Sequence, residues 1–259
     1  MPHLQLKRKI GTIWPRTSYG RKIILLYHSV GNSLWGMPEY NFCEQLNWLS
    51  DYCRVLSLTD LIHAKPSEEL QVALTFDDGY SNLYDRVWLR LEEKKVNATV
   101  YINTGWMGED NKSRKQSVEK LGHYPDEYFL TWDEVKELHQ GGWEIGSHGV
   151  NHYNFPLIED SVTHQELMQS KQDIQVQLNT ACLHFSYPWG RHSTKVRKAV
   201  ESAGYKYAVG GRHAQIAAES DLFVLPRINI AKNYSFEDFK NIVSGKWDYL
   251  GILHRIRGL

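Results

Sequence analysis

The chain has 259 residues, 42% of them hydrophobic and 23% charged, which is the composition of a globular protein with one large core or two modest ones. Thirty basic and thirty acidic residues cancel, so no overall field would recruit nucleic acid or an anionic membrane. No apolar run approaches the roughly 20 residues of a membrane-spanning helix. The three cysteines form no CxxC pair and the first 22 residues lack a secretory signal, so we expect a cytoplasmic protein without a disulfide framework.

Strands and helices alternate along the chain from residue 23 onward. The apolar run IILLYHSV (23–30) predicts a buried strand that ends on His28, and apolar residues at helical spacing between 42 and 49 predict a helix after it. The next expected elements are a strand at 54–58, a short helix at 59–63, a strand at 71–76, a helix at 87–95 and a strand at 97–103. The polar stretch from Thr104 to Phe129 is too long for an ordinary connection, so we expect a functional loop or lid there.

The second half of the chain continues the alternation. A helix at 131–142 begins with a Thr cap, has Glu134 three residues later and stops at glycine. It is followed by a strand at 143–148, a helix at 159–179, a strand at 184–188, a helix at 193–203 and strands at 205–210 and 223–230. This order implies βαβ units and a parallel, barrel-like sheet. We therefore expect an N-terminal extension (1–22), a catalytic barrel (23–235) and an amphipathic helical tail (236–259).

Reactive residues gather at the ends of the predicted strands, where barrels of this kind have their active sites. One strand ends in Asp77-Asp78-Gly79. Two adjacent carboxylates repel each other unless one binds a cation or holds a proton, although a solvated turn explains the pair alone equally well. His148 and His152 are four residues apart, so one helical turn would place them on the same face, as in paired imidazole ligands. Together with a carboxylate, they would hold a metal with positions open for water and substrate.

These motifs resemble those of the polysaccharide deacetylases of carbohydrate esterase family 4. TFDDG (75–79) is similar to the first motif of the family, SHGVNH (147–152) to the second, and SYPWG (186–190) to the third, which is usually Arg-x-Pro-Tyr-Gly. The resemblance runs from about Ile23 to Ile230. It implies an α/β fold, a distorted (β/α)7-type barrel, and a metal-dependent hydrolase that removes an N-acetyl or other small N-acyl group from an amino sugar.

The resemblance also implies roles for individual residues. Asp77 would be the general base, although the sequence alone does not decide which aspartate does which. The expected ligands of a divalent metal are Asp78, His148 and His152. Zinc is expected first, and cobalt, nickel or iron also suit such ligands. The expected substrate-binding residues are Tyr187, Pro188, Trp189 and Arg227.

The chain departs from the family pattern in two places. Ser186 stands where the third motif has arginine, and Arg227 would either supply that charge or cap the barrel rim. The late Leu-x-His motif is absent from the last strand, whereas Leu26-Tyr27-His28 has this form at the end of the first strand. This order resembles a circularly permuted subgroup, the bacterial exopolysaccharide deacetylases. In a closed barrel the first and last strands are neighbours, so His28 would be the general acid, with an unperturbed pKa of about 6.5 close to working pH. His254 mimics the motif but lies beyond the last strand.

Two other functions stay open: hydrolysis of another acyl bond (an ester, a formamide or a cyclic imide), and carbohydrate binding by a non-catalytic pseudo-deacetylase. The expected partner is an N-acetylated amino sugar, in a polysaccharide or in a lipid- or nucleotide-linked precursor, and not a nucleic acid. The tail from Phe236 carries Lys240, Lys246, Arg255 and Arg257 beside apolar residues. It would lie on a membrane surface, or pack against the barrel or a second subunit.

Overall fold

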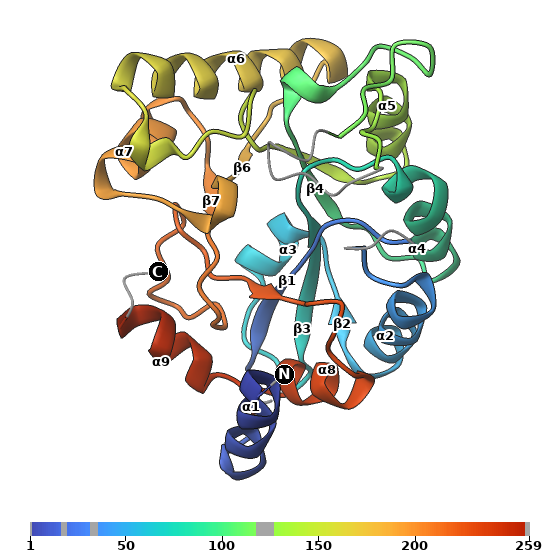
Figure 1. Cartoon of the computed structure of the whole chain (residues 1–259), viewed down its shortest axis with the longest axis vertical. Helices are drawn as coiled ribbons and strands as arrows, with labels where there is room; N and C mark the ends of the chain where they lie inside the picture. Colours follow the sequence, from blue (N-terminus) through green and yellow to red (C-terminus); the bar gives the residue numbers. More distant parts are fainter. Residues whose placement is uncertain (1, 17–19, 32–35, 118–126, 257–259) are drawn as a thin grey trace.

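The computed structural model describes residues 2–16, 20–31, 36–117 and 127–256 (Figure 1). Within these ranges one parallel sheet has the order β7-β6-β5-β4-β3-β1-β8, and β2 pairs with the start of β3. The strands are β1 (Lys22–Tyr27), β2 (Arg54–Val55), β3 (Gln71–Phe76), β4 (Thr99–Ile102), β5 (Glu144–Ser147), β6 (His184–Ser186), β7 (Tyr207–Val209) and β8 (Ile228–Asn229). β1 and β3 are buried along almost their whole length, because helices and loops cover both faces.

The sheet curls into a barrel in which the first and last strands lie side by side. β1 pairs with β3 on one edge and with β8 on the other, where Leu25 lies opposite Ile228. Just before β8, Leu225 forms a parallel bridge with Val209 of β7. The segment 225–229 therefore closes the ring between β7 and β1. The strand that comes first in the chain lies between β8 and the strand that ends in the aspartate pair, as the permuted order predicts.

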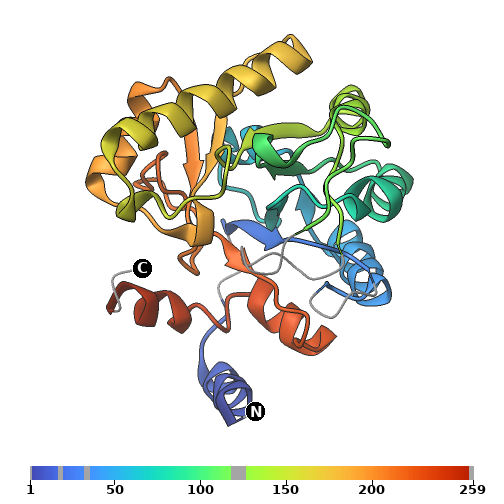
Figure 2. The same ribbon diagram turned by 45° about the horizontal axis from the view of Figure 1, so that its top comes forward.

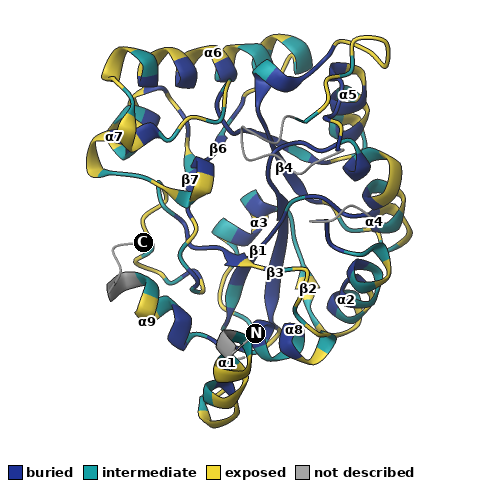
Figure 3. Cartoon of the chain, viewed as in Figure 1, coloured by how far each residue is buried: buried dark blue, intermediate teal, exposed yellow. Residues whose placement is uncertain are grey.

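Helices surround this sheet, and the helix residues that face the sheet are buried (Figure 3). The predicted capping box of Thr131 and Glu134 is confirmed at the start of α5. The helices between the strands are α2 (Glu39–Tyr52), α3 (Leu58–His63), α4 (Leu89–Glu93), α5 (Trp132–Gln140), α6 (Asp160–Leu178) and α7 (Thr194–Ser202).

Several predicted segments differ from the structure, among them the strand expected at 54–58, of which only β2 (Arg54–Val55) is a strand while Leu58 already begins α3. The helix expected at 87–95 begins as a π-helical turn at Leu83–Trp88 and ends, as α4, at Glu93. The strand expected at 223–230 is reduced to β8 and the bridge at Leu225, because Pro226 has no N–H and the Arg227 N–H bonds to the Arg212 carbonyl at 3.1 Å. The long stretch after β4 folds as a short helix, and bridges join residues 108 to 131 and 116 to 128. Residues 118–126 lie outside the described ranges, and a lid function stays a prediction.

The tail helices pack against the protein. Phe239, Val243, Trp247 and Leu250 are buried in the main hydrophobic core, whereas Ile252 and Leu253 are exposed. Among the described helices, none has the length and hydropathy of a membrane span. Figures 1 and 2 show three helices together outside the barrel, namely α1 (Pro2–Ile13), α8 (Phe236–Val243) and α9 (Tyr249–Ile256).

Candidate metal and catalytic site

A strained turn places the aspartate pair at the carboxyl end of β3. The Asp77 N–H still bonds to the Tyr27 carbonyl of β1 at 3.0 Å, and the backbone then turns through Asp78 and Gly79, at φ of 74° and 71°. Positive φ is costly for a residue other than glycine and is concentrated at functional sites. Because of this turn, both carboxylates approach one imidazole: His148 Nε2 is 3.9 Å from Asp77 Oδ2 and 3.6 Å from Asp78 Oδ1.

The histidine pair comes from the loop that follows β5. His148 Nδ1 contacts the Ser186 carbonyl oxygen at 2.7 Å, which leaves Nε2 facing the aspartates. The loop then turns at Gly149 (φ 86°) and at His152 (φ 56°), which brings His152 Nε2 to 3.5 Å from Asp78 Oδ1. Glu166 of α6 accepts the N–H groups of residues 150 and 151 at 2.8 and 2.9 Å. The prediction that the two histidines meet on one helical turn is therefore wrong: a glycine turn, held by Glu166, brings them together.

Asp78, His148 and His152 fit a divalent metal. Their ligand atoms lie within 4.8 Å of one another. Two ligand atoms bound tetrahedrally at about 2.1 Å are about 3.4 Å apart, close to the 3.5 and 3.6 Å that separate the two Nε2 atoms from Asp78 Oδ1. Asp78 Oδ1 is buried and accepts no hydrogen bond from the described residues. Burial, together with the charge of Asp77, raises the pKa of Asp78 to about 7. A cation would stabilise this buried carboxylate.

Asp77 has a different environment because Arg227 grips both of its oxygens. Arg227 Nη1 donates to Oδ1 and Nη2 to Oδ2, each at 2.7 Å, while Nε donates to the Gly210 carbonyl at 3.0 Å. Ser186 Oγ accepts from Arg227 Nη2 at 2.9 Å and donates to Asp77 Oδ2 at 3.2 Å. Burial raises the pKa of Asp77, but the charges of Arg227 and His148 outweigh it and hold the pKa well below its usual range. The charge that the third motif lacks thus comes from the segment before β8.

His28 follows β1 and belongs to the same electrostatic cluster. It is half-buried, and burial lowers the pKa of its imidazole to about 4; Asp77 raises that pKa, while Arg227 and His148 lower it further. The imidazole is therefore neutral at neutral pH in the metal-free protein, and an unperturbed pKa of 6.5 does not describe it. His254 lies on α9, where its Nδ1 accepts the His213 N–H at 3.2 Å.

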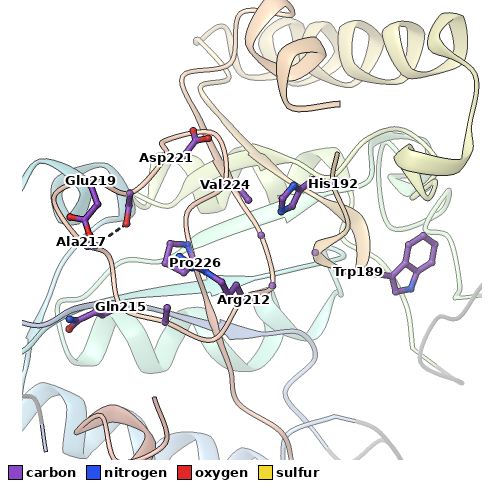
Figure 4. Close-up of a pocket in the computed structure, with 14 residues that line it drawn as sticks. Trp189, His192, Arg212, Gln215, Ala217, Glu219, Asp221, Val224 and Pro226 are labelled. Atoms are coloured by element: carbon purple, nitrogen blue, oxygen red, sulfur yellow. Dashed lines mark hydrogen bonds between the residues drawn. The ribbon is translucent and has the colours of Figure 1, made fainter. Parts of the chain in front are cut away.

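The third-motif residues lie in two environments. Tyr187 and Pro188 are buried, and the Tyr187 hydroxyl donates to the Phe223 carbonyl at 2.8 Å. Trp189 is 54% exposed at a positive φ of 55°, with its ring centroid 4.3 Å from that of His152. A neighbouring pocket of about 550 Å³ lies between the segments after β6 and β7, and in Figure 4 the Trp189 indole points away from the other labelled side chains of this pocket. Trp189 is thus the exposed aromatic residue of the motif.

Two residues that the sequence did not suggest lie at the site. Trp106 packs its ring 5.5 Å from that of His152, and Glu166 carries the histidine loop. Nothing in the sequence near Glu166 marks it, because its partners, two backbone N–H groups and the Asn151 side chain, belong to a loop on another element.

Comparisons with known proteins agree with this geometry. The family model described as polysaccharide deacetylase matches residues 64–208, which include the aspartate and histidine pairs but not His28. The putative polysaccharide deacetylase YxkH of Bacillus subtilis is 27% identical over 91% of this chain and 81% of its own length. The poly-beta-1,6-N-acetyl-D-glucosamine N-deacetylase of Staphylococcus aureus (strain MRSA252) is 22% identical over 83% of this chain and 72% of its own.

Solved structures share the fold. The deacetylase PplD of Streptococcus pyogenes, in complex with acetate, superposes with a TM-score of 0.73 at 24% identity, covering 87% of this chain and 99% of its own. IcaB of Ammonifex degensii has the same TM-score at 16% identity, covering 90% and 100%. The expected barrel is therefore confirmed. Since the family model also spans more than half of the sequence, the chain belongs to the polysaccharide deacetylase family, whose members are metal-dependent enzymes acting on N-acetylated amino sugars.

Proposed function

We propose that this chain removes N-acetyl groups from the amino sugars of a polysaccharide, with a divalent metal held by Asp78, His148 and His152. The observation that carries the proposal is the pairing of two unlike carboxylates: Asp78 faces two imidazoles, and Asp77 is held by Arg227. Asp78 can thus bind a cation, and the ionised Asp77 can accept a proton. A non-catalytic carbohydrate-binding protein would need neither.

Each residue has a separate task in this reaction. A metal held by Asp78, His148 and His152 would lower the pKa of a water and would polarise the amide carbonyl. Asp77 stays ionised beside Arg227 and takes the proton of that water, while the bidentate grip fixes the direction of its oxygens. Arg227, which we expected to bind substrate, has its three guanidinium nitrogens bonded inside the protein and is proposed to position the base.

His28 is proposed to protonate the leaving amine, because amines are poor leaving groups without a proton. Burial keeps it neutral before the reaction. The negative charge that develops on the substrate favours the imidazolium form, and the proton that Asp77 removes from water is available to it.

Trp189 and the pocket beside it support a polymer as substrate. The exposed indole offers an apolar face to a sugar ring. The pocket is lined by polar side chains, among them His192, Arg212 and Gln215, and its volume of about 550 Å³ gives room for a neighbouring sugar. The relative in Staphylococcus aureus is named for a poly-beta-1,6-N-acetyl-D-glucosamine substrate. We propose a polymer of this kind first, and a lipid- or nucleotide-linked precursor second.

Acetate release tests the proposal. The purified protein is incubated with β-1,6-linked N-acetylglucosamine oligomers, with nucleotide- and lipid-linked N-acetylglucosamine, and with ester, formamide and cyclic imide substrates. We expect acetate from the oligomers, loss of that activity with chelator, and its return with zinc or, for this ligand set, with cobalt, nickel or iron. If the protein hydrolyses only the ester, formamide or cyclic imide substrates, N-deacetylation is the wrong function. If it binds the oligomers but releases no acetate with any of these metals, it is a non-catalytic pseudo-deacetylase.

The cellular location is a separate proposal. Cys43, Cys53 and Cys182 are free thiols, which supports a reducing, cytoplasmic compartment. The exposed Ile252 and Leu253 are the remaining support for peripheral membrane contact by the tail. Fractionation of cells that express the chain separates the two: protein in the membrane fraction that high salt does not release would support the contact.

A further inference from the structure

A buried hydrogen-bond network joins three segments at the mouth of the barrel. Ser29 follows His28 after β1, and Asn82 follows the aspartate turn after β3. Glu127 lies near the end of the long segment (104–129) that follows β4. Their exposed fractions are 2%, 7% and 8%. These three residues are far apart in the sequence, and the backbones of the segments after β3 and β4 also meet beside them, where Tyr80 forms a bridge with Phe129.

Asn82 stands at the centre of the network. Its Nδ2 donates to Ser29 Oγ at 2.7 Å and to Glu127 Oε2 at 2.8 Å, and its Oδ1 accepts the Val30 N–H at 3.1 Å. Ser29 Oγ donates in turn to Glu127 Oε1. Both amide hydrogens, the amide oxygen and both carboxylate oxygens are therefore used. A network that is satisfied in this way rigidifies the segments that it joins.

The network fixes the backbone on the far side of His28. On the near side, Tyr27 is held in β1 and accepts the Asp77 N–H at 3.0 Å. On the far side, Ser29 and Val30 are both bonded to Asn82. Asn82 belongs to the loop that carries the proposed base and the proposed aspartate ligand. One amide thus ties that loop to the segment of the proposed acid.

We propose that Asn82 is a positioning residue for deacetylation, which holds the imidazole of His28 in the correct place relative to Asp77 and the metal ligands. Ser29 and Glu127 complete this support. The inference rests on the proposed function, since it needs His28 to act as the acid. It predicts a selective defect, because only a poor leaving group needs that acid. An amine must be protonated as it leaves, whereas 4-nitrophenolate leaves from 4-nitrophenyl acetate without a proton.

The test compares amide and ester turnover in the metal-loaded protein. Asn82→Ala should lower kcat for deacetylation by ~10–10²-fold, since displacements of about 1 Å cost up to this much. KM and metal content should stay near wild type, and hydrolysis of 4-nitrophenyl acetate should be retained. In a His28→Ala background, Asn82→Ala should cause no further loss of amide turnover. The exchange variant Asn82→Asp/Glu127→Gln keeps the net charge and swaps donor and acceptor, so it should recover turnover relative to Asn82→Asp alone.

Glu144→Ala is the matched control. Glu144 lies at the amino end of β5, at the opposite end of the barrel, and accepts the N–H groups of Leu58 and Thr59 and the Thr99 hydroxyl at 2.7–3.0 Å. It should lower stability without changing the ratio of amide to ester turnover. If Asn82→Ala does not fold, Ser29→Ala removes one hydroxyl of the network and should shift the ratio in the same direction.

The outcomes separate this inference from the function on which it rests. If wild type releases no acetate, the proposed function itself fails. If wild type is active but Asn82→Ala loses amide and ester turnover equally, or adds its full loss to His28→Ala, the positioning role is wrong and the function stands.

Discussion

Removing the cation that grips Asp77 should destabilise the barrel in a pH-dependent way. In Arg227→Met the aliphatic stem of the side chain is kept, but two 2.7 Å charge-assisted bonds are lost. Arg227 and Asp77 are 1% and 4% exposed, so solvent does not screen the pair. Removing one partner of such a buried pair costs about 3–5 kcal/mol. We expect a loss of this size in the free energy of unfolding at pH 7, measured by urea denaturation of the metal-free protein.

The sign of the pH dependence follows from Asp77. In wild type its pKa lies below the unfolded value of about 3.9, so the pair contributes stability that is fully present above that pH and is lost as pH falls through the folded pKa. In Arg227→Met, burial without the cation raises the pKa above the unfolded value, so ionisation costs stability as pH rises. The difference between the two proteins should therefore be largest at neutral pH and shrink towards pH 4. Asp77→Asn/Arg227→Met should be more stable than Arg227→Met alone. A difference below about 1 kcal/mol, or one that does not change with pH, would refute the reasoning.

Three further predictions concern the site directly. His148→Ala should bind metal at least ~10-fold more weakly by metal titration, since a ligand is removed; a metal content equal to wild type would remove His148 from the ligand set. Asp77→Asn should lower kcat by ~10²–10⁴ while metal stays bound, and the reverse pattern, with Asp78→Asn keeping its metal, would exchange the two roles. His28→Ala should keep fold and metal and lose ~10²–10⁴ in acetate release, about 3–5 kcal/mol of barrier. His254→Ala should cost little; the opposite ranking in the same assay would mean that His28 is not the acid.

The sequence predicted the elements whose signal is local. Apolar runs marked β1 and β3, because both are buried on two faces, and the residues that follow these runs marked the carboxyl ends of the barrel strands. The metal ligands Asp78, His148 and His152 could be proposed because they lie in two short motifs that directly follow predicted strands. The prediction that His148 and His152 meet on a helical turn is wrong, because spacing alone does not show that Gly149 and His152 take positive φ.

The supporting residues could not be predicted in this way. The sequence left three roles open for Arg227 (the missing charge of the third motif, a cap on the barrel rim and substrate binding), and its contact with Asp77 depends on how the ring closes. Glu166 and Asn82 bond to backbone and side-chain groups of segments that are distant in the sequence, and no local pattern marks such partners. The lowered pKa of His28 likewise comes from burial among side chains that are distant in the chain.

The closure of the ring has a kinetic consequence. Arg227 bonds to Asp77 across 150 residues of sequence, and the pairing of β1 with β8 spans a still larger separation, from Leu25 to Ile228. Contacts between residues so far apart in the sequence form slowly, because the entropy cost of closing the loop must be overcome before they contribute stability. β1 and β3 can pair early, which brings His28 and the two aspartates together while Asp77 still lacks its counter-ion Arg227. During refolding, secondary structure should therefore return before catalytic competence, and a chain growing on the ribosome would hold an unfinished site until the segment around Arg227 has emerged.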